Sequence, residues 1–146
     1  MKTNKKMRHI IFPLIALVAI LCISLIWKKV SEDHGYKNIE LTIKVEEEVI
    51  FSETVQTNEG NLANLLKELE EKNIIQIEYS NSVYGMYIQG LGNTDNIYFE
   101  EPKQSKYWTY DSPNNAQCSK NGFCDAADSL LINDGDSFVF SLANIE

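Results

Sequence analysis

The chain has few of the side chains that most often carry catalysis or bind metals. Its 146 residues include only two histidines and three cysteines. Both histidines, His9 and His34, precede the stretch that reads as a folded domain, so a serine or cysteine nucleophile there has no histidine to act as its base. A tetrahedral zinc site needs four ligands, which two cysteines without a neighbouring histidine do not supply. We therefore expect no catalytic residue, no metal, no resident cofactor and no enzyme activity.

Basic charge is scarce beyond the first thirty-one residues. Residues 1–31 hold six basic residues and no acid, whereas the rest of the chain holds seven basic and 21 acidic residues. Nucleic-acid binding depends on Lys and Arg that neutralise phosphates, and anionic lipid surfaces attract clusters of the same residues. The acidic part of the chain suits neither, so we exclude a nucleic-acid partner and a basic peripheral membrane protein.

One long apolar run stands out. Residues 10–27 read IIFPLIALVAILCISLIW without a charge, and as a helix they would span about 27 Å, close to the thickness of a hydrocarbon core. Four basic residues precede the run and two follow it, which favours an N-terminus in the cytoplasm. The run is predicted to be an uncleaved transmembrane signal-anchor that holds a single-pass protein in the cell membrane.

This topology divides the chain into four parts. Residues 1–9 would be a cytoplasmic tail, 10–27 the anchor, 28–37 a linker, and 38–146 an extracytoplasmic domain. A cleaved signal peptide is the alternative, with Cys22 and Ser24 as the small residues before the cleavage point. Lipidation of Cys22 is disfavoured because Leu21, rather than a small residue, precedes it. Each alternative also places the domain outside the cytoplasm.

The other two cysteines lie close together in the sequence. Cys118 and Cys124 frame the segment CSKNGFC. In an oxidising compartment this pattern predicts a disulfide that pins a loop, with a turn at Asn121–Gly122. The pair is not spaced as CxxC, so a thiol–disulfide oxidoreductase is not indicated.

Hydrophobic periodicity predicts an α+β domain. Leucines at 62, 65, 66 and 69 fall on one side of a helix, which Asn61 or Asn58 could cap. Alternation of apolar and polar residues predicts strands that are listed here by range: 39–46 and 49–55 as a hairpin, 75–79, 97–99, 106–111 and 137–142. Residues 113–128 form the predicted disulfide loop, and Asp134-Gly135-Asp136 reads as a turn rather than a calcium site. The expected architecture is a mixed sheet with one helix covering one face.

Four segments carry a family resemblance: the leucine helix after a hairpin, YGMYIQGLG, the strand-borne YWTY, and the final NDGDSFVF. Together they resemble the transcobalamin C-terminal-domain-like family, a bacterial surface domain of unknown function, over roughly residues 39–142. The resemblance implies a β-grasp-like fold. In vertebrate vitamin B12 carriers the corresponding domain closes over the corrinoid, so the resemblance also implies a corrinoid-like or other small planar ligand.

Aromatic residues supply the candidate binding surface. Six of the seven tyrosines lie between residues 79 and 110. On the strand at 106–111, Tyr107 and Thr109 face one way while Trp108 and Tyr110 face the other, so one set is expected in the core and the other on display. Displayed Tyr and Trp side chains make a rigid amphipathic contact surface. The predicted ligand-binding residues are Tyr84, Tyr87, Tyr107, Trp108 and Tyr110; alternatively, all of them pack the core.

Two functions are compatible with these features. The first is a membrane-anchored extracytoplasmic binding module that captures a corrinoid-like or other small planar ligand for uptake by a transporter. The second is a protein-interaction or structural module of a surface assembly, without a small-molecule ligand.

Overall fold

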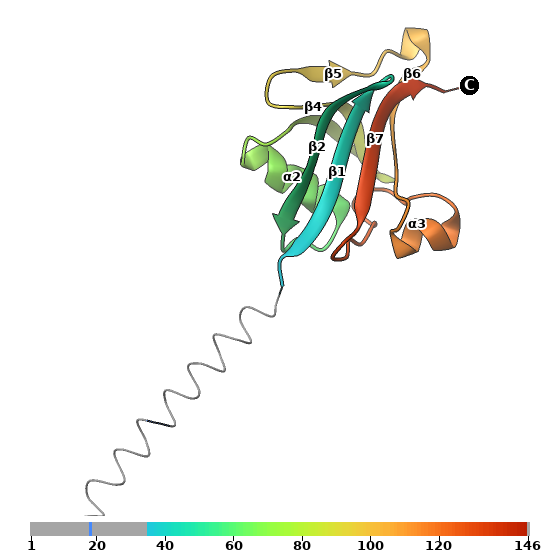
Figure 1. Ribbon diagram of the computed structural model, residues 1–146. Coiled ribbons are helices and arrows are strands. Elements are labelled where there is room, and N and C mark those ends of the chain that lie inside the picture. The colour runs from blue at the N-terminus through green and yellow to red at the C-terminus, as the bar shows by residue number, and fades with distance from the viewer. Residues whose placement is uncertain (1–17, 19–34, 146) are drawn as a thin grey trace, which may run out of the picture. The chain divides into compact units, whose positions relative to one another are not determined.

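The computed structural model describes Val18 and residues 35–145, and the chain from Tyr36 onward forms one compact unit (Figure 1). The predicted tail, the anchor apart from Val18 and most of the linker lie outside the described residues. Within the residues that are described, no helix is both long and apolar enough to cross a bilayer. The anchor at 10–27 thus stays a prediction.

The first and last strands of the domain lie side by side in a four-stranded sheet. Its strands run in the order β2 (Glu48–Thr57), β1 (Lys37–Val45), β7 (Ser137–Asn144) and β6 (Lys106–Asp111). β1 pairs antiparallel with β2 and parallel with β7, and β6 pairs antiparallel with β7. The predicted hairpin of the first two strands and the mixed character of the sheet are confirmed.

Three further strands form a second, antiparallel sheet. Its order is β3 (Gln76–Ser82), β4 (Gly85–Gly92) and β5 (Ile97–Phe99). A short 3-10 helix, η1 (Pro102–Gln104), then leads into β6. Gly92 sits where β4 turns towards β5, and a Cβ atom there would come within 1.9 Å of the backbone oxygen of Asn96. The turn therefore requires glycine.

The predicted leucine helix is α2 (Leu62–Glu71), and all four of its leucines are buried. Asn61 is the cap, since its side chain accepts the backbone N–H of Asn64 at 2.8 Å. On the exposed side Lys72 forms an ion pair with Glu68 at 2.6 Å. Figure 1 shows α2 across one face of the four-stranded sheet. Because a three-turn helix is marginal alone, this packing is what holds it.

A single apolar core lies beneath both sheets and α2. β7 contributes Phe138, Phe140 and Leu142, which are each at most 3% exposed. These are the side chains that the alternation in the last strand placed on one face, and that expectation is confirmed.

Two features depart from the expected single sheet with one helix. The strands divide into two sheets, and at the outer edge of β6 the backbone N–H of Trp108 bonds to the carboxylate of Glu100 at 3.0 Å. In addition, part of the predicted disulfide loop is a second helix, α3 (Ala116–Asn121). This helix has six residues, of which one is buried. Its sequence therefore has no helical repeat of apolar residues from which it could be predicted.

Candidate functional site

The strand that carries YWTY turns one aromatic pair inward. Trp108 is 8% exposed, and its indole N–H donates to the carbonyl oxygen of Tyr98 at 3.0 Å. The ring of Tyr110 lies 5.2 Å from that of Phe140, centroid to centroid. Thr109 on the opposite face is exposed and Tyr107 is half-buried. The alternation along β6 is as expected, and it is the Trp108 and Tyr110 set that packs the core.

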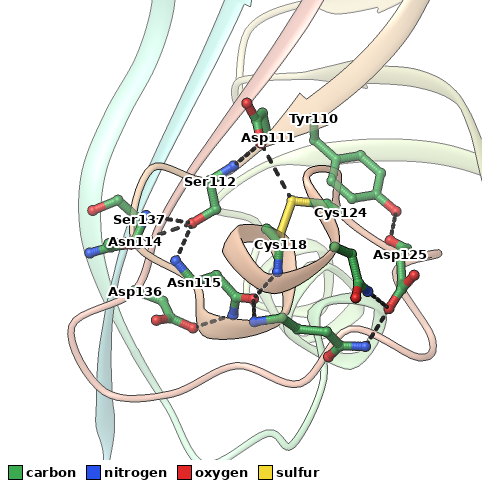
Figure 2. Close-up of a disulfide and its surroundings, with 12 residues drawn as sticks. Tyr110, Asp111, Ser112, Asn114, Asn115, Cys118, Cys124, Asp125, Asp136 and Ser137 are labelled. Carbon is green, nitrogen blue, oxygen red and sulfur yellow. Dashed lines mark hydrogen bonds between the residues drawn. A yellow bond between two sulfur atoms is a disulfide. The ribbon is translucent and has the colours of Figure 1, made fainter.

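Tyr110 also connects β6 to the loop that follows it. Its hydroxyl donates to the backbone oxygen of Asp125 at 2.7 Å, as Figure 2 shows. Burial, together with the nearby charges of Asp128 and Asp125, raises the pKa of Tyr110 to about 12. The side chain is thus a neutral donor with its partner already in place, and it stabilises the loop.

Tyr87 is bonded to a carboxylate. The hydroxyl of Tyr87 donates to Glu100 at 2.5 Å, and the pKa of Tyr87 is raised to about 12, first by this hydrogen bond and then by burial and the charge of Glu100, with Tyr107 adding a smaller contribution. Tyr87 nevertheless stays 45% exposed. Its ring can therefore contact a ligand, although its hydroxyl is occupied.

Tyr84 is the most accessible of the predicted site residues. It sits in the turn between β3 and β4 with 87% of its surface exposed, beside Val83 at 94%. The hydroxyl of Ser82 accepts the backbone N–H of Tyr84 and donates to the oxygen of Gly85, both at 3.1 Å. These bonds hold the turn while its two side chains project into solvent.

The tip of this hairpin lies against the loop that carries the disulfide. A Cβ atom on Gly85 would lie 3.2 Å from Cβ of Ala126 and 3.3 Å from a carboxylate oxygen of Asp128. Gly85 also has a φ of +105°, which a residue with a side chain rarely adopts. Both reasons call for glycine, and the close approach keeps the hairpin tip and the loop side by side.

The loop itself is held by covalent and polar bonds. Cys118 and Cys124 form the predicted disulfide, and Gly122, with a φ of +77°, ends α3 between them. Asn115 caps α3 by accepting the backbone N–H groups of Gln117 and Cys118 at 3.0 and 3.1 Å (Figure 2). Its amide donates to the buried carboxylate of Asp136 at 2.6 Å. These bonds give the loop a defined conformation.

Two exposed apolar residues were not among the site residues predicted from the sequence. Val83 beside Tyr84 and Phe123 beside Cys124 are 94% and 62% exposed. A large apolar residue within two positions of a turn glycine is the sequence signal that could have identified them. Val83 lies two positions before Gly85, and Phe123 directly follows Gly122. Together with Tyr84 they add apolar surface to the hairpin tip and the disulfide loop.

The aromatic residues predicted to bind a ligand thus fall into three places rather than one surface. Trp108 and Tyr110 pack against the core, Tyr87 is bonded to Glu100 with Tyr107 nearby, and Tyr84 stands at the hairpin tip. The ligand-binding role of each stays a prediction. Tyr84 and Tyr87 are exposed, Tyr107 and Tyr110 are half-buried, and Trp108 is buried.

The residues described here offer no ready metal site. No group of three or more His, Cys, Asp or Glu side chains comes together among them. Asp134 instead accepts the backbone N–H of Asn38 at 2.7 Å, and Gly135 has a φ of +86°. The predicted turn before the last strand is confirmed.

Comparisons with known proteins place the fold. No protein-family model matches the chain, and no curated protein matches it. Among solved structures, a protein of Ruminococcus gnavus ATCC 29149 that is described as a candidate metal-binding protein is similar with a TM-score of 0.54 and 18% identity, over 75% of this chain and 99% of that one. Haptocorrin in complex with Cbi is similar with a TM-score of 0.57 and 14% identity, over 77% of this chain.

These likenesses concern the fold. The matched region is 26% of the haptocorrin chain, so this chain corresponds to about a quarter of haptocorrin. The domain has a transcobalamin-like fold, as the four sequence segments suggested.

Proposed function

We propose that the chain is a membrane-anchored extracytoplasmic module that binds a small planar ligand of the corrinoid class at the tip of the β3–β4 hairpin. The observation that carries the proposal is the exposure of Tyr84 beside a loop that a disulfide and a buried Asn–Asp pair keep in shape. An exposed aromatic ring on a rigid support loses little conformational freedom when it stacks on a ligand. The fold similarity to haptocorrin in complex with Cbi supports the choice of ligand class.

The hairpin tip and the disulfide loop would act together. Tyr84 and Val83 would cover one side of the ligand, while Phe123 extends the apolar surface from the loop. Tyr87 and Tyr107 lie on β4 and β6 and would belong to the site only for a ligand that reaches Glu100. The acidic character of the domain favours a neutral or positively charged ligand.

Titration of the full chain with cobinamide and with cobalamin tests the proposal. We expect a shift of the corrinoid absorption bands on binding, and Tyr84→Ala should weaken the affinity at least about fivefold. Tyr36→Ala is the matched control, because Tyr36 is also exposed, at 66%, but lies just before β1. No spectral change up to about millimolar ligand, or equal losses in both variants, would count against a corrinoid site here.

The placement outside the cytoplasm has its own test. In a Cys22→Ser variant expressed in cells, Cys118 and Cys124 should react with a thiol reagent that cannot cross membranes only after a reductant is added. Labelling that needs cell lysis but no reductant would show reduced cysteines inside the cell, and would overturn the proposed topology.

A further inference from the structure

The four-stranded sheet has an uncovered edge at β2. β2 is the outermost strand of that sheet. On β1, the backbone N–H of Glu40 bonds to Asp136 on the β7 side at 2.9 Å, so the alternate residues of β1, such as Leu41, bond to β2. By the same alternation Ser52, Thr54 and Gln56 turn their N–H and C=O groups away from β1. No backbone group of the described residues bonds to these three from outside.

A concavity runs along this edge. It measures about 490 Å³ and is lined by residues 50–53 of β2, by Asn73 and Ile74 after α2, and by Asn93 and Thr94 between β4 and β5. The side chains of Ile50, Phe51 and Ile74 are half-buried against the core and give it an apolar floor. Unpaired strand groups and an apolar groove thus lie side by side, which is the arrangement that β-strand addition uses.

One hydrogen bond shows that the edge accepts a donor placed outside it. The side-chain amide of Asn93 donates to the backbone oxygen of Ile50 at 3.1 Å. This contact occupies one end of the edge and leaves Ser52, Thr54 and Gln56 for a longer partner. Figure 1 shows β2 at the margin of the four-stranded sheet, on the side of β1 away from β7.

The charge along the edge indicates what can bind. β2 contains two glutamates, Glu48 and Glu53, and no basic residue. Glu53 is exposed, lines the concavity, and takes part in none of the ion pairs of the described residues. Of the features that guard exposed edge strands, β2 has a charged side chain and an irregular register near its start, but neither Lys nor Pro. A second copy of this chain paired at β2 would bring no basic side chain to Glu53, because β2 contains none.

We propose that the free edge of β2 is a docking site for an extended basic peptide segment of a partner protein, which adds to the sheet as a fifth strand. Its backbone would pair with Ser52, Thr54 and Gln56. Because alternate side chains of a strand share a face, an apolar side chain would enter the groove over Phe51 and Ile74, and a Lys or Arg two positions away would meet Glu53. The site is separate from the hairpin tip, so it stands or falls independently of the corrinoid proposal.

Binding of a defined peptide to the full chain tests this proposal. The probe is a fluorescein-labelled heptapeptide, Thr-Val-Thr-Lys-Thr-Val-Thr, followed by fluorescence anisotropy and by hydrogen exchange. We expect saturable binding and slower exchange in a fragment that covers residues 50–57. Glu53→Lys should weaken the affinity about tenfold and should favour the same peptide with Glu in place of Lys.

Two further variants make the result specific. Glu78→Lys carries the same charge change at an exposed position of β3 and should bind the peptide nearly as well as the unaltered chain. Thr54→Pro removes one outward N–H, which an edge strand tolerates, and should weaken binding while circular dichroism stays native. Equal losses in Glu53→Lys and Glu78→Lys, or binding without slower exchange in β2, would overturn the proposal. If, without peptide, exchange in β2 became slower as the protein concentration increased, the edge would be pairing with a second copy of the chain. That result would also overturn the proposal.

Discussion

Trp108 donates its backbone N–H to the carboxylate of Glu100 at 3.0 Å. The other oxygen of that carboxylate accepts the hydroxyl of Tyr87 at 2.5 Å. One side chain thus joins β4 of the smaller sheet to β6 of the larger sheet. It also occupies one backbone N–H at the outer edge of β6.

Replacement of Glu100 tests this connection. Glu100→Ala leaves the half-buried N–H of Trp108 and the hydroxyl of Tyr87 without their acceptor, so the free energy of unfolding should fall by about 1–3 kcal/mol. Glu100→Gln keeps an oxygen acceptor and should lose less. Urea denaturation of both variants makes the comparison, and equal losses would show that one amide oxygen cannot replace the two carboxylate oxygens.

Stability should decline at alkaline pH. The pKa values of Tyr87 and Tyr110 are raised from 10.0 to about 12 in the folded protein. A raised pKa means that folding favours the neutral phenol, so this contribution is complete below pH about 10 and is lost as the pH rises towards about 12.

The free energy of unfolding, measured by denaturation at several pH values between about 8 and about 12, should show this decline. Tyrosine titrates in about this pH range. Tyr110→Phe should make the decline in stability with pH less steep. The ring of Tyr110 is more buried than that of Tyr87, and the hydroxyl of Tyr110 is bonded to Asp125. A slope that does not change in Tyr110→Phe would assign the decline to other groups.

Trp108 should matter for folding rather than for ligand contact. Its indole is 8% exposed and bonded to Tyr98, so Trp108→Ala should lower the free energy of unfolding by about 3–5 kcal/mol. Tyr84→Ala should change it by less than about 0.5 kcal/mol, since Tyr84 is exposed. Thermal or urea unfolding of the two variants distinguishes a core residue from a surface residue.

The disulfide should stabilise the loop locally. It closes a short loop, with Cys118 and Cys124 six positions apart, and its loss in a double Cys→Ser variant should lower the free energy of unfolding by about 2 kcal/mol. Hydrogen exchange should quicken in α3 and change little in β7. Faster exchange throughout the domain would mean that the disulfide supports the whole fold.

A glycine pair offers a sharp packing test. A Cβ atom at position 92 would overlap the backbone oxygen of Asn96 at 1.9 Å, whereas a Cβ at Gly60 meets nothing within 4 Å. Gly92→Ala should therefore destabilise the domain by about 1–3 kcal/mol, and Gly60→Ala should be neutral within about 0.5 kcal/mol. Circular dichroism thermal scans of both variants are sufficient to compare them.

Local sequence patterns were enough to predict the leucine helix, the disulfide partners and every strand of the described residues except β4 (Gly85–Gly92), whose glycines interrupt the alternation. Period-two alternation in 137–142 and the spacing of the leucines in α2 depend on residues a few positions apart, so they can be read directly. The turn at Gly135 was readable for the same reason. The helix α3 was not, because its stability comes from the Asn115 cap and the disulfide rather than from an apolar face.

Only the tertiary structure decided which aromatic residues face the core, how the strands divide into two sheets, and which edge stays open. The alternation in YWTY is symmetric, so either face could have been inside until the packing of Phe140 against Tyr110 chose one. Glu100 joins the two sheets, and its partners Tyr87 and Trp108 lie on different strands. Such contacts join residues far apart in the chain, and no local pattern records them.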